Sequence, residues 1–361
     1  MPLSDAYGYR QLIELGVETT YGTAVASSRA LRPSGSVGFH VEDEAKPLAQ
    51  VNGYPVEFFY GQTGSANPRE WKDLPKCEGT IPFEIDFTDF PLLLLLAIGG
   101  RNGTEYTVTG PTDTAAYTHT FRVPTSPAAD MPPSLTVRHF TGLELFTYVG
   151  ALIDTLEISA ANGANLIGTV GLVARNDTPT TGASPTASIS TAPLSHISQT
   201  QLRFNATTGV TTTGGDDKGN IQMWKFSIAN ALRKIGAGGT GGRYIRKPVY
   251  DGPRSFAFEF DTDYEATTWQ NLWRALGSGG YGTLEQIVTS PTLIPGTAAT
   301  PYSMRIRMPA ARFLGNHAQY GGGYGVLPEK VRAVASTHLV GATPTIAEIQ
   351  VVNGQSAAYI T

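Results

Sequence analysis

Cysteine, charge and long apolar runs are all scarce in this chain of 361 residues. The single cysteine, Cys77, excludes an intramolecular disulfide framework and a cysteine-based structural zinc site. The longest apolar run covers residues 90–98, whereas a membrane-spanning helix needs about 20 apolar residues. Residues 1–5 lack the basic-then-apolar pattern of a signal peptide. We therefore expect a soluble protein that is made without an N-terminal export signal and does not associate with a membrane.

Charged residues make up 16% of the chain, against about 25% in a typical globular protein. Few charges leave much of the surface weakly solvated, which is easier to understand if other copies cover it. The net charge of −4 gives no overall attraction to nucleic acid. Residues 1–190 carry a net charge of −9 and residues 191–361 one of +5. Opposite signs favour contacts between unlike halves, although drift in surface composition would produce the same difference.

Strand patterns dominate the sequence, so we expect a mainly β protein. Apolar and polar residues alternate with period two over residues 83–87, 135–138, 256–260 and 304–307. Turn residues separate such runs at short intervals.

Two helices are expected among these strands. The first follows Asp89 in the N-cap position and ends at Gly99. The second spans about residues 264–276, where apolar residues recur at i, i+3, i+4 and i+7 and form one stripe.

The order of these elements repeats along the chain. The strand at 83–87 with its helix recurs 173 residues later, and residues 134–138 resemble residues 303–307 at an offset of 169. This predicts two tandem domains, residues 1–185 and residues 186–361. The alternative is that two β-rich domains share landmarks by chance. Residues 176–198, rich in Thr, Ser, Ala and Pro, are predicted to be a linker or loop.

The first half contains one long stretch, residues 41–78, with four prolines and no sustained periodicity. Long irregular segments in compact domains usually have a function. This one carries aromatic residues, which we expect to pack against another surface. They are Phe58, Phe59, Tyr60 and Trp71. The second half has no stretch as long before its matching strand.

No pattern typical of an enzyme stands out. Residues 236–241 have the letters of a dinucleotide-binding loop, but no helix follows, so a hairpin tip is the better interpretation. The six histidines include no helical metal-binding pair. Asp86 with Asp89, and Asp261 with Asp263, are either paired catalytic carboxylates or helix caps, and capping is favoured.

A basic and aromatic cluster follows the predicted hairpin tip. It is weak evidence for nucleic-acid binding in a net-acidic chain, and it fits the positive side of a subunit contact equally well. Its residues are Arg243, Tyr244, Arg246, Lys247 and Tyr250. We expect no catalytic residue, cofactor or metal site.

Three segments resemble the major tail tube proteins of long, non-contractile-tailed bacteriophages. Residues 15–26 resemble the family's opening strand and its Glu-x-x-Tyr-Gly-Thr turn. Residues 148–159 resemble its later Tyr-x-Gly and strand, and residues 226–232 a strand followed by Asn. The motif residues of the first segment are Gly16, Glu18, Tyr21, Gly22 and Thr23.

The resemblance implies a tube fold, here two tandem β-sandwich or barrel domains each flanked by one α-helix. It implies rings stacked into the tail tube of a virion, through which DNA passes without specific binding. The implied partners are further copies of the chain, the tape measure protein, the tail terminator and distal tail proteins. Synthesis would take place in the cytoplasm of the host bacterium. Because family rings commonly hold six single-domain copies, two domains per chain predict trimeric, pseudo-hexameric rings.

Two other functions remain open at this point. One is a β-sandwich binding protein, such as an adhesin or a carbohydrate-binding module. The other is a β-rich hydrolase. Low charge and the lack of both an export signal and a catalytic motif favour the structural tube protein.

Overall fold

A computed structural model describes about 70% of the chain and confirms a mainly β protein with one α-helix in the described part. No helix among these residues is long and apolar enough to cross a membrane. The described residues are 11–38, 40–42, 45–47, 50–51, 54–55, 70–72, 76–99, 106–123, 133–142, 144–181, 184–205, 216–217, 221–233, 236–237, 244–245, 247–263, 281–314, 328–335, 338–340 and 343–360.

Seven strands of the N-terminal half form one antiparallel group, which we call the first strand set. Its pairings are β1–β11, β11–β12, β12–β14, β12–β13, β13–β8 and β8–β3. The strands are β1 (Leu12–Val17), β3 (His40–Glu42), β8 (Lys76–Glu84), β11 (Leu135–Phe140), β12 (Glu144–Ala161), β13 (Ile167–Val173) and β14 (Asn176–Thr181).

Seven later strands, the second strand set, pair in the same order. The pairings are β15–β23, β23–β24, β24–β28, β24–β25, β25–β22 and β22–β17, all antiparallel. The strands are β15 (Thr200–Asn205), β17 (Ile221–Ala229), β22 (Ser255–Asp263), β23 (Gly282–Leu293), β24 (Pro301–Leu314), β25 (Pro328–Ala335) and β28 (Glu348–Asn353).

The two sets also share a local irregularity. In β11–β12 and in β23–β24, a step of two residues on one strand faces a step of three on the other, which is a β-bulge. The facing pairs are Val137–Tyr148 and Leu135–Ala151 in the first set, and Leu284–Met308 and Gly282–Ala311 in the second.

The sets are joined edge to edge, because β12 of the first pairs with β17 of the second. One sheet therefore runs in the order β3–β8–β13–β12–β17–β22–β25–β24. A second junction joins β28 to β10 (Ala116–Arg122), whose other neighbour is β9 (Tyr106–Asp113). Further short strands are β2 (Arg29–Leu31) on β1, β16 (Asp216–Asp217) on β15, and the pair β26 (His338–Val340) and β27 (Thr343–Thr345).

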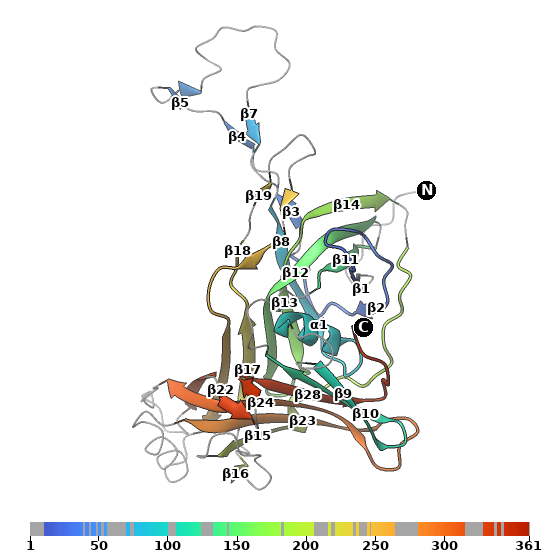
Figure 1. Ribbon diagram of the computed structural model, residues 1–361, viewed down its shortest axis with the longest axis vertical. Helices are drawn as coiled ribbons and strands as arrows, with labels where there is room; N and C mark the ends of the chain where they lie inside the picture. Colours follow the sequence, from blue (N-terminus) through green and yellow to red (C-terminus); the bar gives the residue numbers. More distant parts are fainter. Residues whose placement is uncertain are drawn as a thin grey trace.

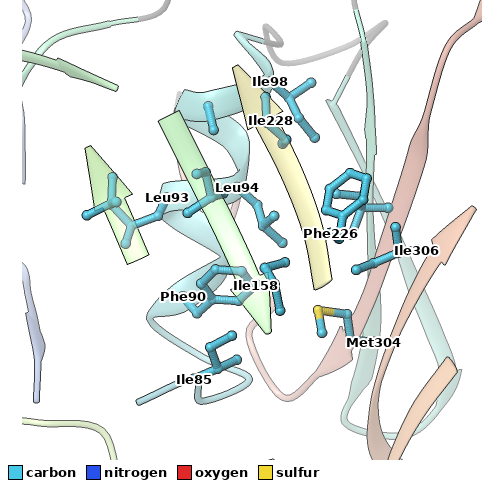
Figure 2. Packing of buried hydrophobic residues seen from close by; sticks show 14 of the residues in the cluster. Ile85, Phe90, Leu93, Leu94, Ile98, Ile158, Phe226, Ile228, Met304 and Ile306 are labelled. Atoms are coloured by element: carbon cyan, nitrogen blue, oxygen red, sulfur yellow. The ribbon is translucent and has the colours of Figure 1, made fainter. Parts of the chain in front are cut away.

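Helix α1 (Phe90–Ile98) confirms the first predicted helix, and all nine of its residues are buried. A helix that is apolar on every side belongs inside a core rather than on a surface. Figure 2 shows Phe90 and Leu94 beside Ile158 of β12, with Phe226 of β17 and Ile306 of β24 continuing the same cluster. The core thus combines residues of both strand sets around one helix. The second predicted helix, residues 264–276, lies outside the described residues.

Three expectations about strands need correction. Residues 176–181 of the predicted linker are strand β14, because the first half of β12 has a free edge that this Thr-rich segment satisfies. Residues 85–87 lie beyond the end of β8. The segments 134–138 and 303–307, which the sequence predicts to be one repeated strand, do not correspond in the two strand sets. Residues 135–138 lie in β11, whereas residues 304–307 lie in β24, which is the counterpart of β12. The strands predicted at 135–138, 256–260 and 304–307 are confirmed.

Candidate assembly surfaces

The segment between β3 and β8, which we call the first arm (residues 43–75), is described at residues 45–47, 50–51, 54–55 and 70–72, and these short strands project from one end of the molecule (Figure 1). Its described part forms two antiparallel ladders, so the absence of periodicity did not mean an absence of strands. The ladders are β4 (Ala45–Pro47) with β7 (Glu70–Lys72), and β5 (Gln50–Val51) with β6 (Tyr54–Pro55). Trp71 lies opposite Lys46 in this arm. Phe58, Phe59 and Tyr60 lie outside the described residues.

A second arm (residues 231–254) connects β17 to β22 at the matching place of the second set. Its ladders are β18 (Leu232–Arg233) with β21 (Val249–Tyr250), and β19 (Gly236–Ala237) with β20 (Tyr244–Ile245). The hairpin predicted around residues 236–241 is confirmed by this pairing, and its tip lies outside the described residues. Sequence reasoning missed the arm as an element, because it is shorter and its Gly-rich centre interrupts any strand pattern.

The base of the second arm is fixed to the C-terminal end of α1. The side-chain amide of Asn230 donates to Ala97 O at 3.0 Å and to Ile153 O at 2.8 Å. The Arg254 guanidinium donates to Ala97 O at 2.9 Å, to Ile98 O and to Asn230 Oδ1. The last carbonyls of a helix lack partners within it and carry its negative dipole end. A cation and an amide from either side of the arm therefore cap α1 and hold the arm at a set position.

The family-like turn of the first set is organised by the buried carboxylate of Glu18. This carboxylate accepts hydrogen bonds from Gly22 N at 2.8 Å, Ser134 Oγ at 2.6 Å, Thr136 Oγ1 at 2.9 Å and Gly150 N at 2.8 Å. The first two family-like segments, which lie about 130 residues apart, thus meet at one side chain. Thr23 closes the turn, because its amide donates to Thr20 O at 3.1 Å.

The other motif residues pack around the same turn. Gly22 and Gly150 both have positive φ, at 73° and 66°, and a Cβ at Gly150 would lie 2.9 Å from the Tyr21 ring. A Cβ at Gly16 would lie 2.6 Å from Ala26 O. Burial raises the pKa of Tyr21 to about 12, so its hydroxyl stays neutral. These contacts explain the motif residues by the packing of the turn.

Asp86 and Asp89 lie where the chain enters α1, and their carboxylates are engaged in structural contacts. Asp86 Oδ1 accepts from the amides of Thr88 and Asp89, both at 2.6 Å. Asp89 occupies the N-cap position without a capping bond, and its carboxylate lies 2.8 Å from Arg29 Nη1. Neither carboxylate therefore makes a helix-capping hydrogen bond, because the amides that Asp86 binds precede the first helical residue, Phe90, and the capping prediction is wrong for this pair. Burial raises the pKa of Asp86 to about 6. Asp261 and Asp263 belong to the last three residues of β22, and the residues that follow lie outside the described part of the chain.

The C-terminal segment closes over this end of the helix. Arg29 donates to Gln355 Oε1 at 2.6 Å and lies over the Tyr359 ring at 4.6 Å. Tyr106 Oη and Gln355 O flank the His119 ring at 2.9 Å on either side. Burial lowers the pKa of His119, so the ring is neutral in this network. Residues from both chain halves thus share one buried polar cluster.

One face of the eight-strand sheet is polar and exposed. Lys225 of β17 lies 3.3 Å from Glu157 and 3.8 Å from Glu259, and Arg332 lies 3.3 Å from Glu259. These four side chains are 34–54% exposed. Their cations are matched by carboxylates on neighbouring strands, which weakens attraction for a passing polyanion. Within the described ranges, no group of three or more His, Cys, Asp or Glu residues is arranged to hold a metal ion.

Comparison with known proteins agrees with this architecture. A family model described as phage tail tube protein matches residues 72–323, which is more than half of the chain and includes strands of both sets. A search of curated proteins finds no match.

Proposed function

The chain belongs to the phage tail tube protein family, and from this premise we propose that it self-assembles into stacked rings that form the tail tube and conduct DNA into the host. As a member of this structural family it is a component of the virion tail. We propose no catalytic role, and synthesis in the cytoplasm of the host bacterium. The tape measure, tail terminator and distal tail proteins are its proposed partners at the ends of the tube.

We propose that the chain holds two tube domains, residues 1–185 and residues 186–361. Six strand pairings that recur in the same order support this proposal. The shared bulge and the arm that follows β3 and β17 support it independently of sequence landmarks. A chance resemblance between two β-rich folds would not reproduce the position of an irregularity.

Three such chains would supply the six positions of a ring. Closed rings need head-to-tail contacts that repeat at a constant rotation. In a ring of two-domain chains, first and second domains alternate, so every contact joins unlike partners. The net charges of −9 and +5 on the two halves suit this alternation.

We propose that the first arm contacts the next ring along the tube axis. Its projection beyond the strand sets, with its aromatic residues, supports this role (Figure 1). Deletion of residues 55–70 should leave a folded protein that forms rings but no long tubes. Normal polymerisation of this variant would show that the arm has another purpose.

We propose that the lumen is lined by polar, net-acidic side chains rather than by free Lys and Arg. DNA carries one charge per about 1.7 Å of its axis, so a basic wall would bind it and slow ejection. The exposed face around Lys225 and Glu259 is the best candidate, because its cations lie beside carboxylates.

Electron microscopy of the purified full-length protein tests the proposed function. We expect rings or tubes with a central channel. A monodisperse monomer under all assembly conditions, or turnover of a substrate that one point mutation abolishes, would contradict it.

A further inference from the structure

Two Asn-Gly pairs lie in the described part of the chain, and their surroundings differ. Asn162 and Gly163 form the turn between β12 and β13, and both residues are exposed. Asn353, which Gly354 follows, is the last residue of β28 and is fully buried. Two further pairs, at residues 52–53 and 102–103, lie outside the described residues. The environment of the asparagine therefore distinguishes the two described pairs.

The turn at Asn162 closes through one backbone hydrogen bond, from Ala164 N to Ala161 O at 3.0 Å. Gly163 has a φ of 74° at the third position, as in a type II turn, and a Cβ there would meet nothing within 4 Å. Within the described ranges, neither the Asn162 side chain nor the Gly163 amide has a hydrogen-bond partner. An exposed turn with so few contacts opens locally at little cost.

A cavity of about 240 Å³ lies beside this turn. Asn162 and Gly163 line it together with His196, Ser198 and Thr200. Because a water molecule takes up about 30 Å³ of the liquid, the cavity has room for several waters next to the Asn162 amide. Water and dissolved base can therefore reach the side chain of Asn162 and the backbone nitrogen that follows it.

Asn353 has the same following residue but none of this freedom. Its side-chain amide donates to Phe87 O at 2.7 Å and to Tyr359 Oη at 2.8 Å, and its Oδ1 accepts from Gln355 N at 2.9 Å. A reaction at this side chain would first have to break three hydrogen bonds in a buried site.

Asn165 separates exposure of the side chain from availability of the backbone nitrogen. Its side chain is exposed, like that of Asn162. The next amide, however, belongs to the buried Leu166 and donates to Ser195 O at 2.8 Å. A nitrogen held in that bond cannot turn toward the Asn165 side chain. Of these three asparagines, only Asn162 combines an exposed side chain with an unengaged nitrogen after it.

We propose that Asn162 is a site of spontaneous deamidation through a succinimide. Dissolved base removes the proton from Gly163 N, and this nitrogen attacks Asn162 Cγ. The new C–N bond closes a five-membered ring, and the side-chain nitrogen leaves as ammonia. Water then opens the ring at either carbonyl, which gives aspartate or isoaspartate. In total, one amide and one water become one carboxylate and one ammonium ion, without oxidation or reduction.

This modification goes beyond the proposed function, because it needs only the single folded chain. It adds one negative charge at the turn between β12 and β13, beside the cavity that His196 and Ser198 line. The isoaspartate product also adds a methylene group to the backbone of the turn.

Peptide mass spectrometry of the full-length protein, incubated at mildly alkaline pH, tests the proposal. Cleavage after Lys and Arg places Asn162 in residues 139–175 and Asn353 in residues 333–361, and fragmentation separates Asn162 from Asn165. Deamidation at Asn162 should be at least about tenfold faster than at Asn353 or Asn165, because those two sites react only after local opening of the fold. In denatured protein, Asn162 and Asn353 should react at similar rates, since glycine follows both.

Two variants provide the controls. Asn162→Gln would require a six-membered ring and should remove the acidic species that anion exchange separates from the unmodified protein. Gly163→Ala adds a methyl group beside the attacking nitrogen and should slow the reaction at residue 162 several-fold. Equal rates at Asn162 and Asn353 in folded protein, or an Asn162 that reacts only after denaturation, would overturn the inference. Neither outcome bears on ring formation, so the proposed function is tested separately.

Discussion

The two strand sets carry the same pairing pattern with opposite charges at matched positions. Glu14 of β1 lies opposite Arg138 of β11, whereas Arg203 of β15 lies opposite Glu285 of β23. Glu14 is fully buried and accepts hydrogen bonds from the backbone amides of Thr186 and Ala187. Glu285 is 1% exposed and forms ion pairs with two arginines, Arg305 and Arg307, whereas Glu14 has Arg138 Nη1 at 4.0 Å.

Backbone pairing and the apolar face therefore determine the strand order. The sign of the charge at a matched position can be exchanged without changing that order. The first set has the carboxylate Glu14 where the second has the cation Arg203, and the cation Arg138 where the second has the carboxylate Glu285. Charge is then available to distinguish one set from the other, which is what an alternating ring requires.

The largest effect is expected where the second set buries its ions. Glu285 is 1% exposed and forms ion pairs with Arg305 and with Arg307 Nε at 3.4 Å. Glu285→Gln should lower the free energy of unfolding by about 4 kcal/mol, because the buried Arg307 and the partly buried Arg305 both lose the negative charge of Glu285.

An exposed carboxylate of the same set provides the control for that variant. Glu259 is 42% exposed and lies near Lys225 and Arg332, so Glu259→Gln should cost less than about 1 kcal/mol. Denaturant unfolding measures both, and equal losses would show that the charge row on the second set is not buried in solution.

A smaller loss of stability is expected from a substitution in α1, the helix that packs against both strand sets. Leu94→Ala removes a fully buried side chain and should cost about 3 kcal/mol through lost burial and a cavity. Leu293, which is 47% exposed at the end of β23, is the matched control. Leu293→Ala should change the stability by less than about 0.5 kcal/mol. Similar losses for the two leucines would mean that α1 is not enclosed.

Helix α1 could be predicted from its local sequence, whereas strand β14 could not. Nine apolar residues between an acidic entry and Gly99 leave few alternatives to a buried helix. Strand β14 was missed because Pro179 and the five polar residues of the strand suit a loop, and only the free edge of β12 selects a strand. Tertiary pairing, which no local pattern contains, made that choice.

The family-like turn shows the same limit for the candidate site. Residues 15–26 suggested a strand and a turn, but nothing local indicates that Glu18 reaches Gly150 and Ser134. The second arm was missed for a related reason, since its position follows from the repeat of strand pairings rather than from its composition. The sequence similarities at offsets of 173 and 169 residues also do not match the offsets between corresponding strands of the two sets.

A pH-dependent difference is expected at the entry to α1 in the first set. Burial raises the pKa of Asp86 from its ordinary value of 3.8 to about 6. A carboxyl whose pKa is higher in the folded state binds its proton more tightly there, so the fold gains stability as pH falls from about 6 to about 4. Asp86→Asn keeps an acceptor for the two amides and should remove about 2 kcal/mol of this pH dependence.

Comparing how the free energy of unfolding depends on pH in the wild type and in Asp86→Asn separates the contribution of Asp86 from that of His119. His119 opposes it, because its lowered pKa makes stability fall as pH falls below about 6.5, and that contribution is common to both proteins. Parallel curves for wild type and Asp86→Asn between pH 4 and 6 would contradict the raised pKa.

The smallest effect separates backbone conformation from packing in the first set. Gly150 and Gly163 both have positive φ, at 66° and 74°, and a Cβ at Gly163 meets nothing within 4 Å. Gly163→Ala should cost about 1 kcal/mol from the left-handed backbone alone. Gly150→Ala should cost about 1 kcal/mol more, because its Cβ would lie 3.0 Å from Arg175 Cβ and closer still to Tyr21. Thermal unfolding compares them, and equal costs would mean that the turn is loosely packed.

The number of chains in a single ring tests the central claim most directly. Native mass measurement of isolated rings, or averaging of end-on views with a tag on one terminus, counts them without reference to any variant. Two tube domains per chain predict three chains and six pseudo-equivalent positions around the channel. Six full-length chains per ring would contradict the two-domain account.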